Sequence, residues 1–468
     1  MSQKLAYSAT GKALLAGGYL VLVPEYSAYV VALSARMHAI IHGSPVSGNK
    51  TTITAQSPQF AQGKWRFEVD TSGPNAYQAM VATHFPQNPF LEYAITVVLS
   101  YLQPIHNYNI ELTIYSDDGY HSQDEAKGNS DSRFHNHDLP IHKVPKTGLG
   151  SSAALTAAVT AALLGFYRSL GVPLNADSAT PTLLDVNSRA DLVLVHNLAQ
   201  LAHCTAQGKI GSGFDVAAAV FGSLVYRRFP AAAIAAVADL GHTARVPLGD
   251  DTIPQTAAYL KAMRELVDAP IDNTEGPWAP LQLEPCAMPR GIAVLMGDVR
   301  GGSETPKLVS TILQWRKDKP EEAGRVWTAL NAANMGVVSA LAGLRALEQK
   351  LGPKAYDEKL LAGEGLDELG EQLRLVRKYL KEMTDLSKVP VEPEEQTRLL
   401  DACAKLPGVV GGVVPGAGGY DAISLVVVAS AIPQLKEASR ELPISWLDLR
   451  EQSQGLVQED PEHTQYSV

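Results

Sequence analysis

The chain has 468 residues, 46% of them hydrophobic and 19% charged, which is the composition of a globular protein with a large core and two or three domains. Its 39 basic and 49 acidic residues give a formal net charge of −10, which argues against nucleic acid or an anionic membrane as the main partner. The three cysteines, Cys204, Cys286 and Cys403, are far apart and lack CxxC spacing, so we expect neither a disulfide framework nor a thiolate metal site, and a reducing, cytoplasmic compartment fits best.

The first predicted elements are β-strands. Residues 13–33, ALLAGGYLVLVPEYSAYVVAL, alternate apolar runs with a Gly-Gly pair and a Pro-Glu-Tyr turn, which predicts a strand, a tight bend and a second strand. Apolar and polar residues alternate in NIELTIYS, residues 109–116, as in a half-buried strand. Residues 116–143 are almost wholly polar, and we expect an exposed excursion that is mobile or partly disordered.

This excursion includes the histidine-rich stretch FHNHDLPIH. It brings His135, His137 and His142 near Asp138, a set of side chains that can bind zinc. The spacing fits no standard zinc template, however, so we expect a flap whose order depends on nucleotide rather than a structural metal site.

A helix is predicted after the excursion, in residues 145–164, PKTGLGSSAALTAAVTAALL. Its uncharged Ala- and Thr-rich run favours a helix buried in the core over a membrane span. Gly148 and Gly150 allow a left-handed backbone and close approach of a ligand, and Ser151 and Ser152 could cap the helix. The positive end of this helix would attract a phosphate, but the hexapeptide GLGSSA alone fits an ordinary helix entry equally well.

Two rival phosphate-binding motifs are not supported. The chain has no GxxxxGK[ST] sequence. Gly148-x-Gly150-x-x-Ala153 formally matches a dinucleotide-binding fingerprint, but it follows Pro145-Lys146 rather than an apolar strand, and no acidic residue stands about 20 positions further on. A Rossmann dehydrogenase is therefore disfavoured.

The remaining elements predict a second α/β unit. Residues 183–206 have a helical pattern, GSGFDVAAAVFG is a small-residue turn entering a helix, and SLVYRRF is a strand. Seven prolines in residues 247–290 indicate a connecting region. Beyond it we expect a strand in GIAVLMGDV, charged amphipathic helices in residues 321–350 and 366–383, and a strand in AISLVVVA after a Gly-rich turn. The predicted division is 1–240, 241–290 and 291–468.

Four segments carry a family resemblance by their order and spacing. They are YSATGKALLAGGYLVL with Lys12, the GLGSSA loop, GKIGSGFDVAAA with Asp215, and the Gly-rich turn VVPGAGGYDAISLVV. Together they resemble the GHMP kinase superfamily. Within it, residues 11–39, 146–159, 202–223 and 297–309 resemble the phosphomevalonate kinases of fungal type, and Gly17-Gly18-Tyr19 stands where mevalonate kinases and galactokinases usually have Gly-Glu-His. Thr10 departs from the proline that the family typically has before Gly-Lys.

The resemblance implies an α+β fold with two domains. One is an N-terminal domain like ribosomal protein S5 domain 2, the other a C-terminal ferredoxin-like domain, with the site between them. It implies transfer of a phosphoryl group from ATP to 5-phosphomevalonate in the mevalonate route to isoprenoids and sterols, with Mg²⁺, by a monomer or homodimer. The alternatives are another GHMP kinase acting on mevalonate or a sugar, and a catalytically silent regulatory relative; Lys12, Ser152 and Asp215 argue against silence.

The resemblance also implies residue roles. Lys12 would stabilise charge on the transferring phosphoryl group, and Asp215 would act through Lys12 and acceptor orientation more than as an obligatory base. Ser152 would ligate Mg²⁺; the second ligand stays open, because Ala206-Gln207-Gly208-Lys209 stands where relatives often have a glutamate. The expected ATP-binding residues are Lys146, Gly148, Leu149, Gly150, Ser151, Ser152 and Ala153. The expected substrate-binding residues, each equally compatible with a surface or turn role, are Tyr19, Lys209, Ser212, Gly213, Arg300, Ser303 and Thr305.

Overall fold

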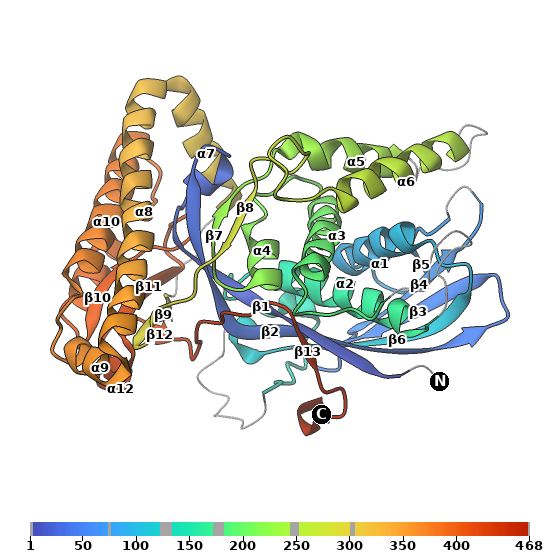
Figure 1. Cartoon of the computed structure of the whole chain (residues 1–468), viewed down its shortest axis with the longest axis horizontal. Helices are drawn as coiled ribbons and strands as arrows, with labels where there is room; N and C mark the ends of the chain where they lie inside the picture. The colour runs from blue at the N-terminus through green and yellow to red at the C-terminus, as the bar shows by residue number, and fades with distance from the viewer. Residues whose placement is uncertain are drawn as a thin grey trace.

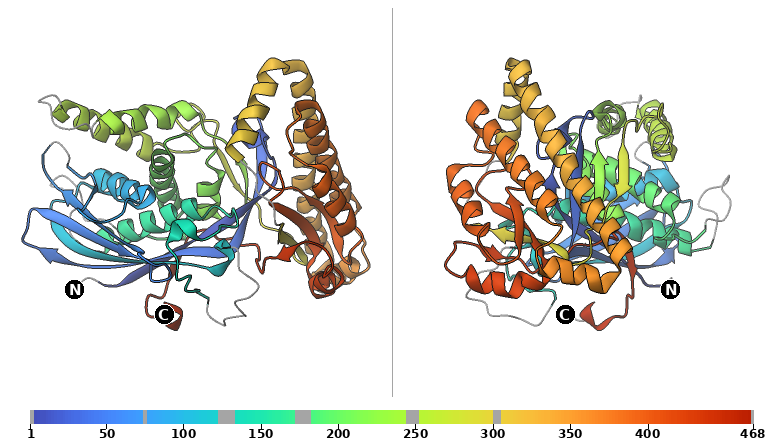
Figure 2. Two further views of the ribbon diagram at one scale, coloured as in Figure 1. Left: turned by 180° about the vertical axis from the view of Figure 1, so that it is seen from behind. Right: turned by 60° about the vertical axis from the view of Figure 1, so that its left-hand side comes forward.

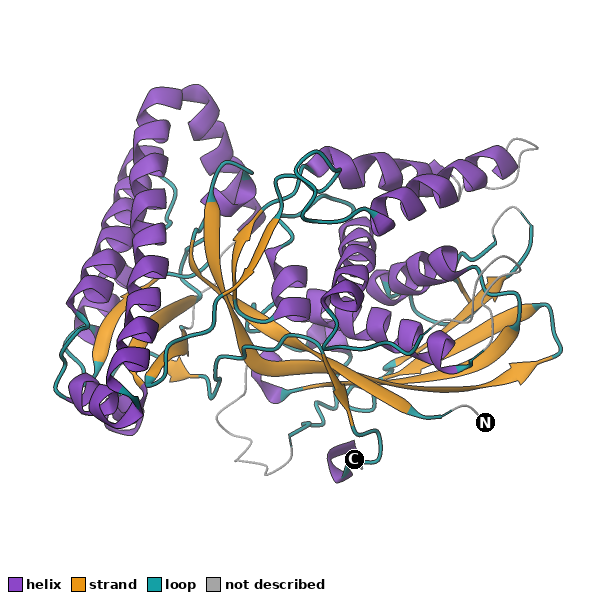
Figure 3. Cartoon of the chain, in the orientation of Figure 1, coloured by secondary structure: helices purple, strands orange, loops and turns teal. Residues whose placement is uncertain are grey.

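The computed structural model describes residues 3–73, 76–121, 133–171, 182–243, 252–299 and 305–466. It has two α/β units: a large sheet with helices on one face, and a smaller sheet beside a tall pair of helices (Figures 1 and 3). Seen from behind, the helix pair stands beside one end of the large sheet (Figure 2). The predicted α+β class is confirmed.

The large sheet contains nine strands in the described part of the chain. Strand β3 pairs in parallel with β6, whereas the other pairs are antiparallel. The main path runs through β13 (Val457–Glu459), β1 (Leu5–Ala16), β2 (Ser27–Val46), β6 (Asn107–Ser116), β3 (Lys50–Gln56), β4 (Lys64–Asp70) and β5 (Met80–Val81). Off this path, β7 (Leu224–Arg227) pairs with the start of β2, and β8 (Gln282–Pro285) pairs with β7.

Helices cover one face of this sheet (Figure 3). They are α1 (Pro89–Leu102), α2 (Ser151–Ser169), α3 (Arg189–Gln207) and α4 (Phe214–Phe221). Helices α5 (Ala231–Thr243) and α6 (Thr252–Asp268) pack outside them, on α1 and α3. Helix α2 lies directly on β1 and β2, and every residue from Ala153 to Tyr167 is buried. Its small side chains allow this close approach: a Cβ on Gly165 would lie only 2.4 Å from the Tyr7 hydroxyl. The prediction of a buried helix is confirmed.

Over its described residues, the second unit has a four-stranded antiparallel sheet in the order β10-β11-β9-β12. Its strands are β9 (Ile292–Asp298), β10 (Val409–Val413), β11 (Ala422–Val428) and β12 (Ser445–Trp446). Its helices are α7 (Thr305–Asp318), α8 (Pro320–Leu351), α9 (Pro353–Leu361), α10 (Asp367–Ser387), α11 (Glu394–Cys403) and α12 (Ile432–Ala438). Helices α8 and α10 pack against each other, and α10 also contacts β10.

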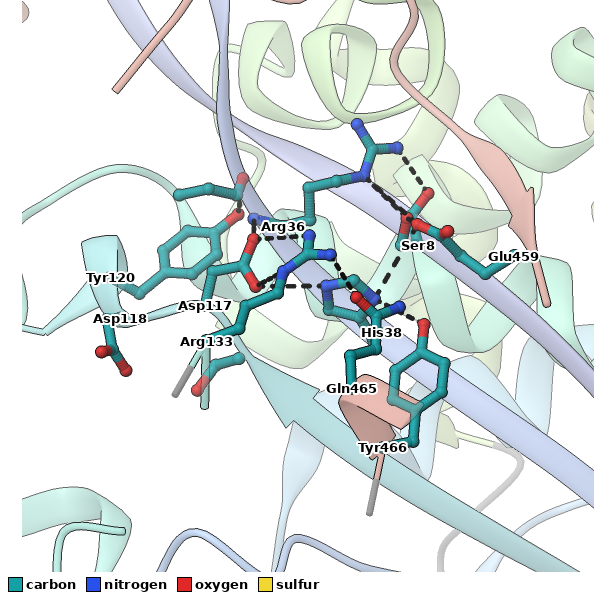
Figure 4. A network of polar contacts seen from close by, with 12 residues as sticks. Ser8, Arg36, His38, Asp117, Asp118, Tyr120, Arg133, Glu459, Gln465 and Tyr466 are labelled. Atoms are coloured by element: carbon teal, nitrogen blue, oxygen red, sulfur yellow. Dashed lines mark hydrogen bonds and ion pairs between the residues drawn. The ribbon is translucent and has the colours of Figure 1, made fainter. Parts of the chain in front are cut away.

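The C-terminal segment returns to the first unit. The Gln452 amide donates to the Ala32 carbonyl at 2.9 Å, and β13 pairs with β1. A polar network beside this strand ties it to the sheet (Figure 4): Arg36 Nε donates to Ser8 Oγ at 2.7 Å, and Ser8 Oγ donates to Glu459 Oε1 at 2.5 Å. The predicted domain boundaries at residues 240 and 290 remain a prediction. The C-terminal segment from Gln452 to Glu459 packs with the large sheet of the first unit.

The polar excursion is less exposed than expected. Asp117 and Phe134 are buried, and Arg133 donates to both carboxylate oxygens of Asp117, at 2.6 and 3.0 Å. The ring of Phe134 stacks on Tyr115 of β6 with centroids 4.8 Å apart. Composition does not reveal these long-range contacts, so the prediction of an exposed stretch was wrong at Ser116, Asp117, Tyr120, His121 and Phe134. Residues 135–143 are exposed or half-buried, as expected, and residues 122–132 lie outside the described residues.

Other elements differ from expectation in their bounds. Helix α3 begins at Arg189 instead of residue 183, because the Ser188 hydroxyl caps it by accepting from the Asp191 amide. The proline-rich connecting region contains helix α6 and strand β8. None of the described helices is long and apolar enough to cross a membrane.

The buried His196 of α3 predicts a pH dependence of stability. Its ring lies near Phe221 and Trp278, and its Nδ1 is 3.0 Å from Asn197 Oδ1. Burial lowers its pKa to about 4 from 6.5. The unfolded chain therefore takes up this proton as the pH falls below about 6.5, while the folded chain resists protonation until about pH 4, so stability is lost across that window.

We predict that the lowered pKa of His196 makes the free energy of unfolding about 2 kcal/mol smaller at pH 5 than at pH 7. At pH 5 the unfolded chain binds a proton at this side chain, whereas the folded chain does not. In His196→Asn, which keeps a side-chain donor, the stability difference between the two pH values should shrink by about that amount. Urea unfolding at both pH values measures it, and comparing differences within each protein removes the cost of the substitution itself. An unchanged pH difference in the variant would contradict the prediction.

Candidate active site

The loop before α2 lies against β1. The backbone amide of Lys12 donates to the Leu149 carbonyl at 2.9 Å, and Lys12 Nζ donates to the Gly148 carbonyl at 2.9 Å. The register of β1 against β2 shifts between Thr10 and Gly11, just before Lys12. Thr10, the departure from the family pattern, donates its hydroxyl to the Ala218 carbonyl of α4 at 3.0 Å, so this position is held by a hydrogen bond.

Gly150 is where the separate sequence motifs meet. Its φ of 80° is left-handed, a conformation that favours glycine. A Cβ added there would lie 3.2 Å from Lys12 Cε and 3.7 Å from Asp215 Cβ. Residues 12, 150 and 215, far apart in sequence, therefore occupy one site.

The prediction that Ser151 and Ser152 cap α2 was wrong. Gly150 is the N-cap residue, the helix begins at Ser151, and no side chain caps it. The Ser152 hydroxyl is instead 3.1 Å from His203 Nε2 of α3. The positive end of α2 therefore faces the site without a competing side-chain acceptor, which suits an anionic ligand.

Helix α4 brings Asp215 to the same site. Its N-cap is Gly213 with a φ of 84°, so Asp215 is the second helical residue rather than the cap, and its Oδ1 accepts from the Val216 amide at 3.0 Å. Burial lowers the pKa of Lys12, and the carboxylate of Asp215 opposes that shift. Lys12 Nζ also lies 5.6 Å from the centroid of the Phe214 ring. Among the described residues, the cation of Lys12 and the carboxylate of Asp215 thus lie together with the positive ends of two helices.

A cavity of about 320 Å³ lies on one side of the loop, between the two units. The first unit contributes Lys12, Tyr19, Leu22, Gly148, Leu149, Ser212 and Phe214, and the second contributes Met296, Val309 and the Gly-rich turn at residues 415–418. The Tyr19 hydroxyl donates to the Ala417 carbonyl, and the Gly416 amide donates to the Leu14 carbonyl at 3.3 Å. This cavity is therefore built jointly by both units.

A second cavity, of about 400 Å³, lies on the other side of the loop in the first unit. Its lining includes the aromatic residues Phe60, Trp65 and Phe90, together with Lys146, Ser151 and Ser152 from the loop and the start of α2. The Phe90 ring stacks on His203 with centroids 5.6 Å apart. The start of α2 thus contributes to this cavity, and the loop before it to the cavity between the units.

Some predicted residues lie elsewhere. Ala153 is fully buried in the core, and Lys209 is exposed and lines neither cavity. Thr305 is the first residue of α7. Arg300 and Ser303 lie outside the described residues.

Sequence reasoning missed three polar side chains behind the site. His203 contacts Ser152, and Gln207 Nε2 lies 3.2 Å from the same ring nitrogen. Since an amide nitrogen only donates, His203 Nε2 accepts from Gln207. Arg228 binds the turn before α4. His203 and Gln207 lie four positions apart, on one face of a helix, in a segment that carries the family resemblance, and this spacing could have identified them. Nothing in the sequence around Arg228 indicates its role.

Comparisons with known proteins agree with this geometry. The family model of the GHMP kinases N terminal domain matches residues 132–223. The chain is 42% identical to "Phosphomevalonate kinase" of Candida albicans, over 98% of each chain. It is 36% identical to "Phosphomevalonate kinase ERG8" of Gibberella zeae, covering 90% of this chain and 87% of that protein.

Solved structures show the same fold at low sequence identity. The Streptococcus pneumoniae phosphomevalonate kinase in complex with phosphomevalonate and AMPPNP has a TM-score of 0.56 and 18% identity, covering 96% of this chain and 99% of that one. The Lin0012 protein of Listeria innocua has a TM-score of 0.61 and 17% identity, covering 98% of this chain and all of that one. The two-domain GHMP kinase fold is confirmed, and the extent and identity of the fungal matches establish that the chain belongs to the phosphomevalonate kinase family.

Proposed function

We propose that this chain transfers the γ-phosphoryl group of ATP to 5-phosphomevalonate, giving 5-diphosphomevalonate and ADP. The observation that carries the proposal is the meeting of Lys12, Asp215 and the uncapped start of α2 at Gly150, beside two cavities. Phosphoryl transfer depends mainly on positioning and on stabilising charge, and this arrangement supplies both. Membership of the phosphomevalonate kinase family identifies the acceptor.

ATP fits the cavity lined by aromatic residues. Phe60, Trp65 and Phe90 offer apolar surface to a planar base, and Lys146 and the start of α2 lie where a triphosphate would follow. Residues 148–152 would then hold the phosphates through backbone amides. The predicted ATP-binding loop stays a proposal, with Ala153 supporting it from the core.

Magnesium fits the donors present. The described residues contain no group of three or more His, Cys, Asp or Glu side chains that could hold a metal ion. Mg²⁺ commonly binds nucleotide phosphates with only one or two protein oxygens, and the Ser152 hydroxyl is a suitable one. Bound there, the ion would neutralise charge on the ATP phosphates.

The acceptor fits the cavity between the units. Lys12 would neutralise charge on the transferring group, with Tyr19 and Ser212 among the cavity walls. A phosphate monoester has a second pKa of about 6 and is already ionised at neutral pH, so removal of a proton is not a required step. Asp215 would then orient the acceptor and hold Lys12 in place. A monomer or homodimer in the cytoplasm remains our expectation.

The function is tested with the purified protein, ATP and Mg²⁺ against phosphomevalonate, mevalonate, homoserine and galactose. We expect ADP formation with phosphomevalonate at a rate far above the others. Turnover of a different acceptor alone would overturn the substrate assignment, and no turnover of any of them would favour a catalytically silent relative.

Replacement of Ser152 tests the proposed metal ligand. In Ser152→Ala we expect Mg²⁺ to strengthen ADP binding about tenfold less than in the wild type, because an oxygen ligand is lost. Isothermal titration with ADP in Mg²⁺ and in EDTA measures this. Ser169→Ala, at the other end of α2, is the matched control. Equal Mg²⁺ dependence in all three proteins would rule out Ser152 as a ligand.

Replacement of Asp215 separates orientation from proton removal. In Asp215→Asn we expect turnover to fall about 100-fold or more, equally from about pH 7 to about pH 9, because the acceptor is already ionised throughout. The ratio of variant to wild-type kcat across this range is the measurement. A loss that is rescued at high pH would instead assign Asp215 as a general base.

A further inference from the structure

Arg228 connects two walls of the cavity between the units. It follows β7 directly, and its guanidinium donates to backbone carbonyls of two segments that are far apart in sequence. One Nη1 bond goes to the Leu22 carbonyl. Two Nη2 bonds go to the carbonyls of Ile210 and Gly211, at 3.1 and 2.9 Å. A single planar group thus holds both segments.

Both segments belong to the cavity proposed for the acceptor. Leu22 lines it and ends the short helix Leu20–Leu22, which follows Tyr19, another lining residue. Residues 210 and 211 lead into Ser212 and Phe214, which also line it, and then to Asp215. Arg228 itself does not line the cavity. Any influence on the acceptor must therefore pass through these two walls.

Hydrogen bonds from Arg228 link the two segments directly. The turn is also anchored by the Tyr226 hydroxyl of β7, which donates to the Ser212 carbonyl at 2.6 Å. Tyr19 has a left-handed φ of 62°, which is uncommon outside glycine and needs support from its surroundings. No ion pair of the described residues includes Arg228, so its charge is directed to carbonyl oxygens. The fork shape of arginine, which lysine lacks, matches acceptors on two sides.

We propose that Arg228 is a positioning residue that fixes the Leu22 wall of the acceptor cavity against the turn carrying Asp215, and so controls acceptor binding without touching the acceptor. The inference rests on the proposed function and adds a residue to it. It predicts a selective effect: the acceptor site should loosen, while the nucleotide site on the other side of the loop should not. The positive charge alone, without the fork, should not suffice.

The neighbouring Arg227 provides a matched control. Its Nε lies 3.3 Å from Ser27 Oγ, and its contact is with β2 rather than with the walls of the cavity. The experiment compares the full-length wild type with Arg228→Lys, Arg228→Ala, Arg227→Lys and Arg227→Ala. It measures KM for phosphomevalonate, KM for ATP and kcat, together with the thermal midpoint of each protein.

We expect Arg228→Lys to raise the acceptor KM about tenfold or more, because at least one charge-assisted hydrogen bond is lost, with the ATP KM within about twofold of the wild type. Both Arg227 variants should resemble the wild type. An acceptor KM within about twofold of the wild type in Arg228→Lys, or an equal rise in both KM values, would overturn the selective role.

Chemical rescue separates the fork from the charge and covers the case in which Arg228→Lys is poorly folded. Added methylguanidinium should lower the acceptor KM of Arg228→Ala, and methylammonium at the same concentration should not. Equal rescue by both cations, or by neither, would contradict the proposal. Wild-type turnover of phosphomevalonate tests the proposed function separately, since the inference depends only on the ratios of variant to wild type.

Discussion

The site depends on a close approach at Gly150. Lys12 on β1 and Asp215 on α4 both reach the start of α2 there, and a side chain at this position would lie 3.2 Å from Lys12. The backbone must also turn left-handed, so that α2 begins with no side-chain cap. The buried alanine-rich body of α2 then fixes this end rigidly, because it packs directly on β1 and β2. The packing of α2 on the sheet therefore fixes the position of Gly150 relative to Lys12 and Asp215.

Both units line the cavity proposed for the acceptor. Their contact between Tyr19 and Ala417 places the Gly-rich turn of the second unit over a cavity that begins at Lys12. The C-terminal segment then returns to β1, the strand that carries Lys12. A cavity whose walls come from both units makes phosphoryl transfer sensitive to their relative position. Arg228 acts on the same cavity from behind, on the side of the first unit.

The sequence predicted the parts that local pattern encodes. Alternation identified β6, and apolar runs beside turns identified parts of β1 and β2 together with β7, β9 and β11, whereas β3 and β4 were not predicted. The order of the Gly-rich segments, with Lys12 and Asp215, identified the family. Local pattern could not show that Ser152 contacts His203 rather than capping its own helix, because that choice depends on how α3 packs against α2. It also could not show the bond from Arg228 to Leu22, which joins residues 206 positions apart. Contacts between residues so far apart in the sequence depend on the whole fold.

The central claim is that the loop at Gly150 separates a nucleotide cavity from an acceptor cavity. A crystal structure of the chain with a non-hydrolysable ATP analogue, Mg²⁺ and phosphomevalonate tests it most directly. The account predicts the triphosphate against the backbone of residues 148–152, the base beside Phe60, Trp65 and Phe90, and the acceptor phosphate near Lys12 between the two units. Phosphomevalonate in the aromatic cavity, or a triphosphate away from the start of α2, would contradict it.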